Sequence, residues 1–174
     1  MAAPLQPSLP QGVRLRPGSP SDAAFLRSAV LRERLNPLGL HPERFTVAER
    51  QRPSGVVEII GFGQIKPVSG GAALELASLV VEKGERGRGL GAALVRDLVG
   101  RAGGTPLFLM TIQSRAALYN RCGFEEVPAS SLLQVPAFML AEALAGVVVA
   151  YLVTRQRLVL MRCAHDATAP PQQQ

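Results

Sequence analysis

The chain contains no tryptophan and, among its 174 residues, only two tyrosines, two cysteines and two histidines. A surface that stacks nucleic-acid bases needs aromatic side chains interleaved with basic ones, and no such run is present. Cys122 and Cys163 form no CxxC pair, and two histidines are too few for a His-rich metal site. The sequence therefore argues against a nucleic-acid partner and a bound metal, and it favours an intracellular, reducing compartment.

Acidic residues are missing from the N-terminal stretch before Asp22, which is rich in proline, serine and arginine. The stretch lacks the continuous apolar core of a secretory signal. Its composition is compatible with an organelle-targeting remnant, so cytoplasm, plastid and mitochondrion all stay open. We expect a mobile tail over residues 1–12, a single domain over 13–163 and a disordered polar tail over 164–174.

The overall composition is that of a globular protein, with 47% hydrophobic and 18% charged residues. The length suits one domain with a sizeable core. The net charge of +6 suits an acidic partner, and equally an enzyme that binds a polyanionic cofactor.

Hydrophobic periodicity and turn residues predict an α+β domain with a mixed sheet. A capping box at Ser19 and Asp22 begins a first helix, which Asn36-Pro37 ends and which buries Phe25. Three strands that resemble an antiparallel meander follow, and then helices alternate with further strands. The expected strands are 13–16, 45–49, 56–67, 73–81, 106–112, 124–127 and 157–163, and the later helices are 92–101 and 114–122.

The segment from Val135 to Val153 is apolar apart from Glu142, and it is long enough to span a bilayer. Pro136 and Gly146 interrupt it, which favours a soluble helix or helix pair packed on the core. A membrane span, or a helix that faces a membrane or a partner, stays open as an alternative.

The most informative stretch runs from the apolar strand Leu74–Val81 through Arg86–Gly91 into a helix that starts at Ala92. A glycine-rich turn before a helix directs backbone N–H groups and the helix dipole at one point, which suits a phosphate. The same glycines also fit the dinucleotide pattern G-x-G-x-x-[GA]. That pattern expects a first βαβ unit and an acid about 20 residues on, and both are missing. A glycine turn that binds nothing is the other alternative.

Two motifs resemble the GCN5-related N-acetyltransferase (GNAT) superfamily. Arg86–Gly91 fits its [QR]-x-x-G-x-[GA] signature, and Tyr119–Phe124 fits a later Y-x-x-x-G-F element. The resemblance covers roughly residues 13–163. It implies a single-domain GNAT-like fold: a mixed, mostly antiparallel sheet, splayed between the fourth and fifth strands, with helices on both faces. Lys83 and the length of segment 131–154 depart from the family pattern, and the second departure affects the acceptor side.

The resemblance implies acetyl-CoA as co-substrate and assigns two groups of residues to it. Backbone N–H groups would hold the pyrophosphate, while the end of the fourth strand would pair with the pantetheine amides. An N–H near Val81 would meet the oxyanion. The first group is Arg86, Gly87, Arg88, Gly89, Leu90, Gly91 and Ala92, and the second is Leu79, Val80 and Val81.

Amine acetylation also needs a base and an acid, because amines are mostly protonated at neutral pH. Glu75 is the first candidate base, since strand alternation directs it away from its neighbours Leu74 and Leu76. A solvated strand face would be its ordinary environment. Glu58 and Ser78 are further candidates. Tyr119 occupies the family's tyrosine position and would protonate the leaving thiolate, or only pack against the cofactor.

These residues predict an acetyl-CoA-dependent N-acetyltransferase in which a primary amine attacks directly in a ternary complex. The amine could belong to a protein lysine, a protein N-terminus or a small molecule. The alternative is a non-catalytic GNAT-like module that binds acyl-CoA and docks to a partner or membrane through residues 135–153. A dinucleotide oxidoreductase is the third hypothesis.

Overall fold

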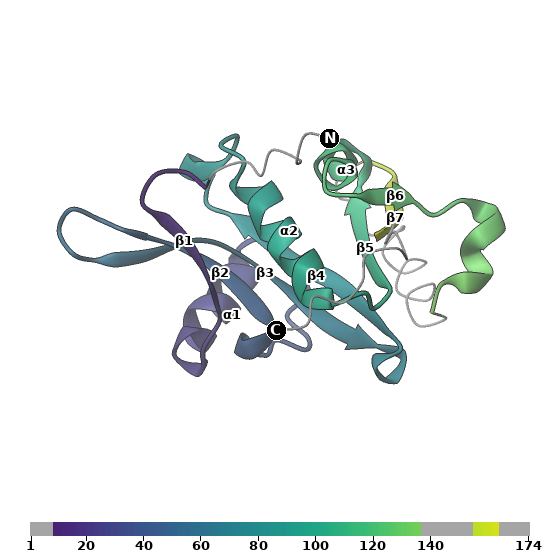
Figure 1. Cartoon of the computed structure of the whole chain (residues 1–174), viewed down its shortest axis with the longest axis horizontal. Helices are drawn as coiled ribbons and strands as arrows, with labels where there is room; N and C mark the ends of the chain where they lie inside the picture. Colours follow the sequence, from purple (N-terminus) through teal and green to yellow (C-terminus); the bar gives the residue numbers. More distant parts are fainter. Residues whose placement is uncertain (1–8, 137–154, 164–174) are drawn as a thin grey trace, which may run out of the picture. The chain divides into compact units, whose positions relative to one another are not determined.

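The computed structural model describes residues 9–136 and 155–163. Figure 1 shows its strands and helices along the chain. The strands are β1 (Val13–Pro17), β2 (Phe45–Gln51), β3 (Val57–Val68), β4 (Ala73–Val81), β5 (Leu107–Ile112), β6 (Phe124–Glu126) and β7 (Leu158–Cys163). The α-helices are α1 (Ala23–Arg32), α2 (Leu90–Ala102) and α3 (Gln113–Asn120). Short 3-10 turns lie at Pro20–Asp22, Pro42–Arg44, Ser69–Gly71, Lys83–Glu85 and Ala129–Gln134.

The described strands form one seven-stranded sheet in the order β1-β2-β3-β4-β5-β7-β6. The pairs β1/β2, β2/β3, β5/β7 and β6/β7 are antiparallel, whereas β4/β5 is parallel. This confirms the mixed, mostly antiparallel α+β sheet expected from the sequence. The parallel register joins Leu74 to Leu107 and Glu75 to Phe108, at the start of both strands. From Leu76 onward β4 belongs to a different compact unit from its first three residues. The splay expected between the fourth and fifth strands stays a prediction.

The described residues divide into two compact units. The first contains β1, β2, the helices α1 and α2, β3 up to Lys66 and β4 from Leu76. Its two helices cover opposite faces of the sheet, because Val47 and its neighbour Ala48 on β2 belong to different cores. The α1 core consists of Leu26, Ala29, Val30, Phe45, Val47, Phe62 and Val80. The α2 core consists of Val13, Ala48, Ile60, Leu90 and Leu94, with Leu9 packed against it.

Helix α1 begins as expected, at the capping box of Ser19 and Asp22, but it ends at Arg32, before Asn36-Pro37. Arg34 adopts a left-handed φ of 56°. Its N–H donates to the Leu31 carbonyl, and the Leu35 N–H donates to the Val30 carbonyl, each at 3.0 Å. This hydrogen-bond pattern is a Schellman motif, which stops a helix without proline.

The predicted burial of Phe25 on α1 is wrong. Phe25 is 37% exposed, although its ring makes an edge contact with Phe62 at 6.3 Å. The apolar residues of α1 cover a wider part of the helix surface than the sheet does, so Phe25 lies at the margin of the buried face.

The second unit contains the start of β4, β5, α3, β6 and β7. Leu107, Phe108 and Leu109 of β5 are at most 2% exposed. The apolar run therefore forms a doubly covered central strand, as predicted. Val68, Ala73, Phe108 and Val135 pack together in this unit, with Val127 and Leu160 beside them.

The predicted docking segment 135–153 lies outside the described residues, except for Val135 and Pro136. The same holds for residues 1–8 and 164–174 of the two predicted tails. Within the described ranges, every helix is too short or too polar to cross a membrane.

Candidate functional site

The glycine turn connects the end of β4 to α2 in the first unit. Gly87 and Gly89 adopt φ angles of +79° and +81°. A Cβ built on either residue would meet nothing within 4 Å, so glycine is needed here for its backbone angle and not for space. Positive φ angles in such a turn are typical of the backbone nests that bind anions.

Helix α2 begins inside the glycine motif, at Leu90, and not at Ala92 as predicted. The Ala93 N–H donates to the Gly89 carbonyl at 3.0 Å, which makes Gly89 the first acceptor of the helix ladder. The N–H groups of Leu90 and Gly91 precede that ladder and lie at the positive end of the helix dipole. Turn and helix start therefore form one continuous set of backbone donors.

The two arginines of the motif have different surroundings. Arg86 donates from Nε to the Val81 carbonyl at 2.8 Å, and its guanidinium lies 3.5 Å from the Glu33 carboxylate. Arg88 is 59% exposed at its side chain and lies 3.4 Å from Glu85. Arg86 thus ties the turn to the end of β4, whereas Arg88 extends toward solvent.

The side chains at the end of β4 pack on both faces of the sheet in the first unit. Val80 is buried in the α1 core, while Leu79 and Val81 are half-buried against the α2 core. The Glu82 N–H donates to the Ile60 carbonyl of β3. The predicted pantetheine strand is therefore held by β3 and by packing on both faces.

Ser78 interrupts β4 with a left-handed φ of 53°. The Gln64 side chain donates from Nε2 to Ser78 Oγ at 3.2 Å, and Gln64 itself is 1% exposed. From the sequence, Ser78 was only a further candidate base. Its left-handed backbone was not predicted, because serine has no particular preference for such an irregularity in a strand. Glu58, the other further candidate, forms an exposed ion pair with Arg52 at the β2–β3 turn.

Glu75 lies at the start of β4 in the second unit, paired in register with Phe108. It is only 6% exposed, so it does not lie on the solvated strand face considered from the sequence. A carboxylate held out of bulk water acts as a general base only if the substrate proton comes within hydrogen-bond reach. Its catalytic role stays a prediction.

Tyr119 lies on α3, also in the second unit, and is 8% exposed. Its ring makes an edge contact with Phe124 at 6.0 Å. Burial raises the pKa of Tyr119 above its usual value, against the lowering effects of the Arg115 charge and a hydrogen bond with Thr111. The phenol therefore carries its proton at neutral pH, as an acid for a thiolate must. Whether it donates that proton stays a prediction.

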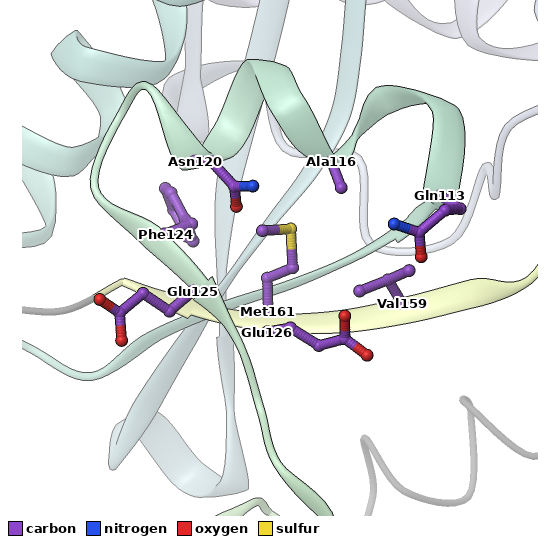
Figure 2. Close-up of a pocket in the computed structure, with 8 residues that line it drawn as sticks. All are labelled: Gln113, Ala116, Asn120, Phe124, Glu125, Glu126, Val159 and Met161. Carbon is purple, nitrogen blue, oxygen red and sulfur yellow. The ribbon is translucent and has the colours of Figure 1, made fainter.

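A cavity of about 400 Å³ lies in the second unit beside α3, and neither Tyr119 nor Glu75 lines it. Figure 2 shows the side chains of Val159 and Met161 on β7 directed toward α3. The other lining residues are Gln113, Ala116, Asn120, Phe124, Glu125 and Glu126. The predicted site residues and this cavity are therefore separate features of the unit.

The described residues contain no cluster of three or more His, Cys, Asp or Glu side chains that could hold a metal ion.

Comparison with known proteins identifies the fold around these residues. Residues 41–126 match the acetyltransferase (GNAT) domain family. The chain carries a GNAT domain. The matched range contains the glycine turn, the end of β4, Glu75 and Tyr119, so it covers every predicted site residue of this GNAT domain. It also decides against the dinucleotide interpretation of the glycines. The comparison with curated proteins gives no match.

Solved structures share the fold of this GNAT domain at low sequence identity. N-acetylglutamate synthase from Neisseria gonorrhoeae, complexed with coenzyme A and N-acetyl-glutamate, is 14% identical with a TM-score of 0.62 over 88% of this chain. The matched part is 35% of the synthase, so the present chain spans about a third of that protein.

Two further structures match over most of their own length. Rv2747 from Mycobacterium tuberculosis, in complex with CoA, is 22% identical with a TM-score of 0.59, over 84% of this chain and 97% of that one. NAA60 from Arabidopsis thaliana, in complex with acetyl-CoA, is 22% identical with a TM-score of 0.51, over 67% and 88%. At these identities the likeness establishes the GNAT fold.

Proposed function

We propose that this protein is an acetyl-CoA-dependent N-acetyltransferase that acetylates a primary amine by direct attack in a ternary complex. The observation that carries the proposal is the glycine turn between β4 and α2, with positive φ at Gly87 and Gly89, inside a matched GNAT domain. Structures that share the fold hold coenzyme A or acetyl-CoA, which supports the same ligand here.

In this proposal the first unit binds the co-substrate. The backbone from Arg86 to Ala92 holds the pyrophosphate, because its N–H groups precede the helix ladder and meet the positive end of the dipole. The edge of Leu79–Val81 pairs with the amides of the pantetheine arm. Acetyl-CoA supplies an acyl group on a thiolate leaving group.

The second unit supplies the proton transfers. Glu75, directly or through a water, takes a proton from the ammonium form of the acceptor. The amine nitrogen then forms a bond to the thioester carbonyl carbon while a backbone N–H near Val81 stabilises the oxyanion. As the C–S bond breaks, Tyr119 donates its proton to the thiolate, and the nitrogen returns its second proton to the Tyr119 phenolate, directly or through a water, so that a neutral amide and the CoA thiol leave.

The proposal is tested first by binding and turnover together. Acetyl-CoA at 100 times its Kd should stabilise the native state by about 2.7 kcal/mol, which a thermal melt detects. Thiol release is then measured with amines from each open class: spermidine, L-glutamate, a lysine-containing peptide and a peptide with a free N-terminus. No thermal shift at millimolar acetyl-CoA and no thiol release would contradict the proposal. A thermal shift with no release from any amine would instead support the non-catalytic acyl-CoA-binding module.

A further inference from the structure

A largely buried ion pair joins the glycine turn to the sheet of the first unit. Arg50 of β2 donates from both terminal nitrogens to the two carboxylate oxygens of Glu85, with Nη2 to Oε2 at 2.8 Å. The Arg50 and Glu85 side chains are only 15% and 10% exposed. Glu85 lies two residues before Gly87, so this bidentate contact fixes the backbone at the entrance to the glycine turn.

The same carboxylate reaches forward along the turn. Glu85 Oε2 lies 3.4 Å from Nη1 of Arg88, which follows Gly87. One acid therefore connects β2 to residues on both sides of that glycine. Hydrogen bonds from Arg50 hold the pKa of Glu85 below its usual range, against the opposing effect of burial, so the connection is charged at neutral pH.

Two further contacts hold the residues before Glu85. Arg32 of α1 forms an ion pair with Glu82 at 2.6 Å, and Arg86 donates to the Val81 carbonyl at 2.8 Å. Together with the Glu85 contacts they anchor the chain from Val81 to Arg88. In contrast, Gly87 and Gly89 have no side chains that could hold their left-handed angles.

A buried ion pair is a poor device for stability alone, because desolvation offsets most of the Coulomb attraction. Its well-attested use is to select one conformation of the groups that it joins. A glycine turn needs such a device more than a helix or strand does, because glycine has the largest conformational freedom to lose. Preorganised donors bind an anion without first losing that freedom.

We propose that Glu85, clamped by Arg50, is the positioning residue that sets the phosphate-binding conformation of the glycine turn before acetyl-CoA arrives. This inference rests on the proposed function. It assigns Glu85 no contact with the ligand, and it predicts an effect on co-substrate affinity and none on the chemical step.

Glu49 offers a matched control on the same strand as Arg50. Its carboxylate is 4% exposed and is held by two arginines, Arg14 and Arg16, but it joins β1 to β2 and has no contact with the turn. Glu49→Gln and Glu85→Gln therefore each remove one buried charge from a two-arginine cluster. Similar losses of thermal stability are expected from both, whereas only Glu85→Gln should change the turn.

The experiment measures KM for acetyl-CoA and kcat in the wild type, in both Gln variants and in Glu85→Asp, with the amine that the panel identifies. For Glu85→Gln we expect KM for acetyl-CoA to rise about tenfold, or 1.4 kcal/mol, with kcat within about twofold. Glu49→Gln should keep the wild-type KM, and Glu85→Asp should recover part of the loss. Amide hydrogen exchange at 86–91 in the ligand-free protein should be faster in Glu85→Gln only.

An unchanged KM in Glu85→Gln, or an equal rise in Glu49→Gln, would overturn the inference. If Glu85→Gln does not fold, Arg50→Met/Glu85→Gln removes both partners of the buried contact, and the Arg88 charge that loses Glu85 is 59% exposed and stays solvated. The double variant should show the same rise in KM. A wild-type KM in that double variant would also overturn the inference. Failure of the wild type to bind acetyl-CoA would instead contradict the proposed function, so the two failures are distinguishable.

Discussion

The acidic groups with shifted pKa values shift in opposite senses in the described parts of the two units. In the described part of the first unit, Asp22, Glu49 and Glu85 have lowered pKa values, so their charged forms are favoured. In the described part of the second unit, burial raises the pKa values of Tyr119 and Cys163, so their neutral forms are favoured. The three shifted carboxylates of the first unit are paired with arginines, whereas the two shifted groups of the second unit are removed from water.

This difference matches two tasks of the proposed reaction. Holding a polyanion requires donors that stay in place, and paired charges fix the backbone that carries them. Moving a proton requires groups that keep or accept one near neutral pH, and burial adjusts pKa values in that direction. Substitutions in the first unit should therefore change affinity for acetyl-CoA, and substitutions in the second should change kcat.

The largest effect is expected at Glu75. Glu75→Gln should lower kcat by roughly 10²- to 10⁴-fold, because the amine loses its base, and leave KM for acetyl-CoA unchanged. Raising the pH toward the amine pKa should reduce the loss, since a neutral amine needs no base. Steady-state kinetics across pH measure both. Glu126→Gln, which removes an exposed acid paired with Arg157, is the control. Wild-type kcat in Glu75→Gln would contradict the role.

A smaller loss of kcat is expected at Tyr119. Tyr119→Phe removes the proton donor but keeps the ring against Phe124, so kcat should fall about 10²-fold with little change in melting temperature. Stopped-flow detection of free thiol with saturating acetyl-CoA measures the step. A rise in KM for acetyl-CoA at constant kcat would show that Tyr119 only packs against the co-substrate.

In the first unit, Gly89→Ala should weaken acetyl-CoA binding and spare kcat. Gly89 has a φ of +81° and open space around its Cβ position, so alanine adds strain and no clash. That strain of about 1–2 kcal/mol corresponds to a loss in affinity of roughly tenfold. Gly84→Ala is the matched control, because it also meets open space but does not require a left-handed φ. Equal affinities of the two variants for acetyl-CoA, measured by isothermal titration calorimetry, would contradict phosphate binding by the glycine turn.

The smallest effect concerns acid stability. Hydrogen bonds from Arg16 lower the pKa of Asp22 from 3.8 to about 2, so its carboxylate stabilises the fold above pH 3.8. This contribution, about 1 kcal/mol after solvent screening, should disappear as the pH falls from 3.8 to about 2. Urea midpoints over that range should converge for the wild type and Asp22→Asn. A difference between the two urea midpoints that stays constant over this pH range would contradict the stabilising role of the Asp22 carboxylate.

Local sequence patterns were sufficient for most elements of the fold. The strand bounds Ala73–Val81 are those expected, and left-handed Gly103 follows α2, which ends within one residue of its expected end. Helix α3 ends at Asn120, two residues before its expected end. The errors lie where local signals compete with tertiary packing. Pro37 indicated the end of α1, but Arg34 ends it earlier in a left-handed conformation that no residue preference of arginine predicts.

The candidate site divides in the same way. The spacing of Arg86, Gly87 and Gly89 is a local property, because the three lie within four consecutive residues and positive φ angles favour glycine at two of them. The burial of Glu75 and the irregular backbone at Ser78 depend on the neighbouring strands, and strand alternation alone left both open. The Arg50–Glu85 contact joins residues 35 apart in sequence, so no local pattern could predict it.

The sequence by itself determined where a phosphate could be bound, because glycine angles and a helix start are encoded within a few consecutive residues. It also identified the two candidate groups for proton transfer, Glu75 as a base and Tyr119 as an acid. Tertiary structure decided which of these groups are buried and which arginine meets which carboxylate. Burial and ion pairing depend on desolvation and on contacts between distant strands and helices. In our proposal, these long-range contacts hold the glycine turn in one conformation.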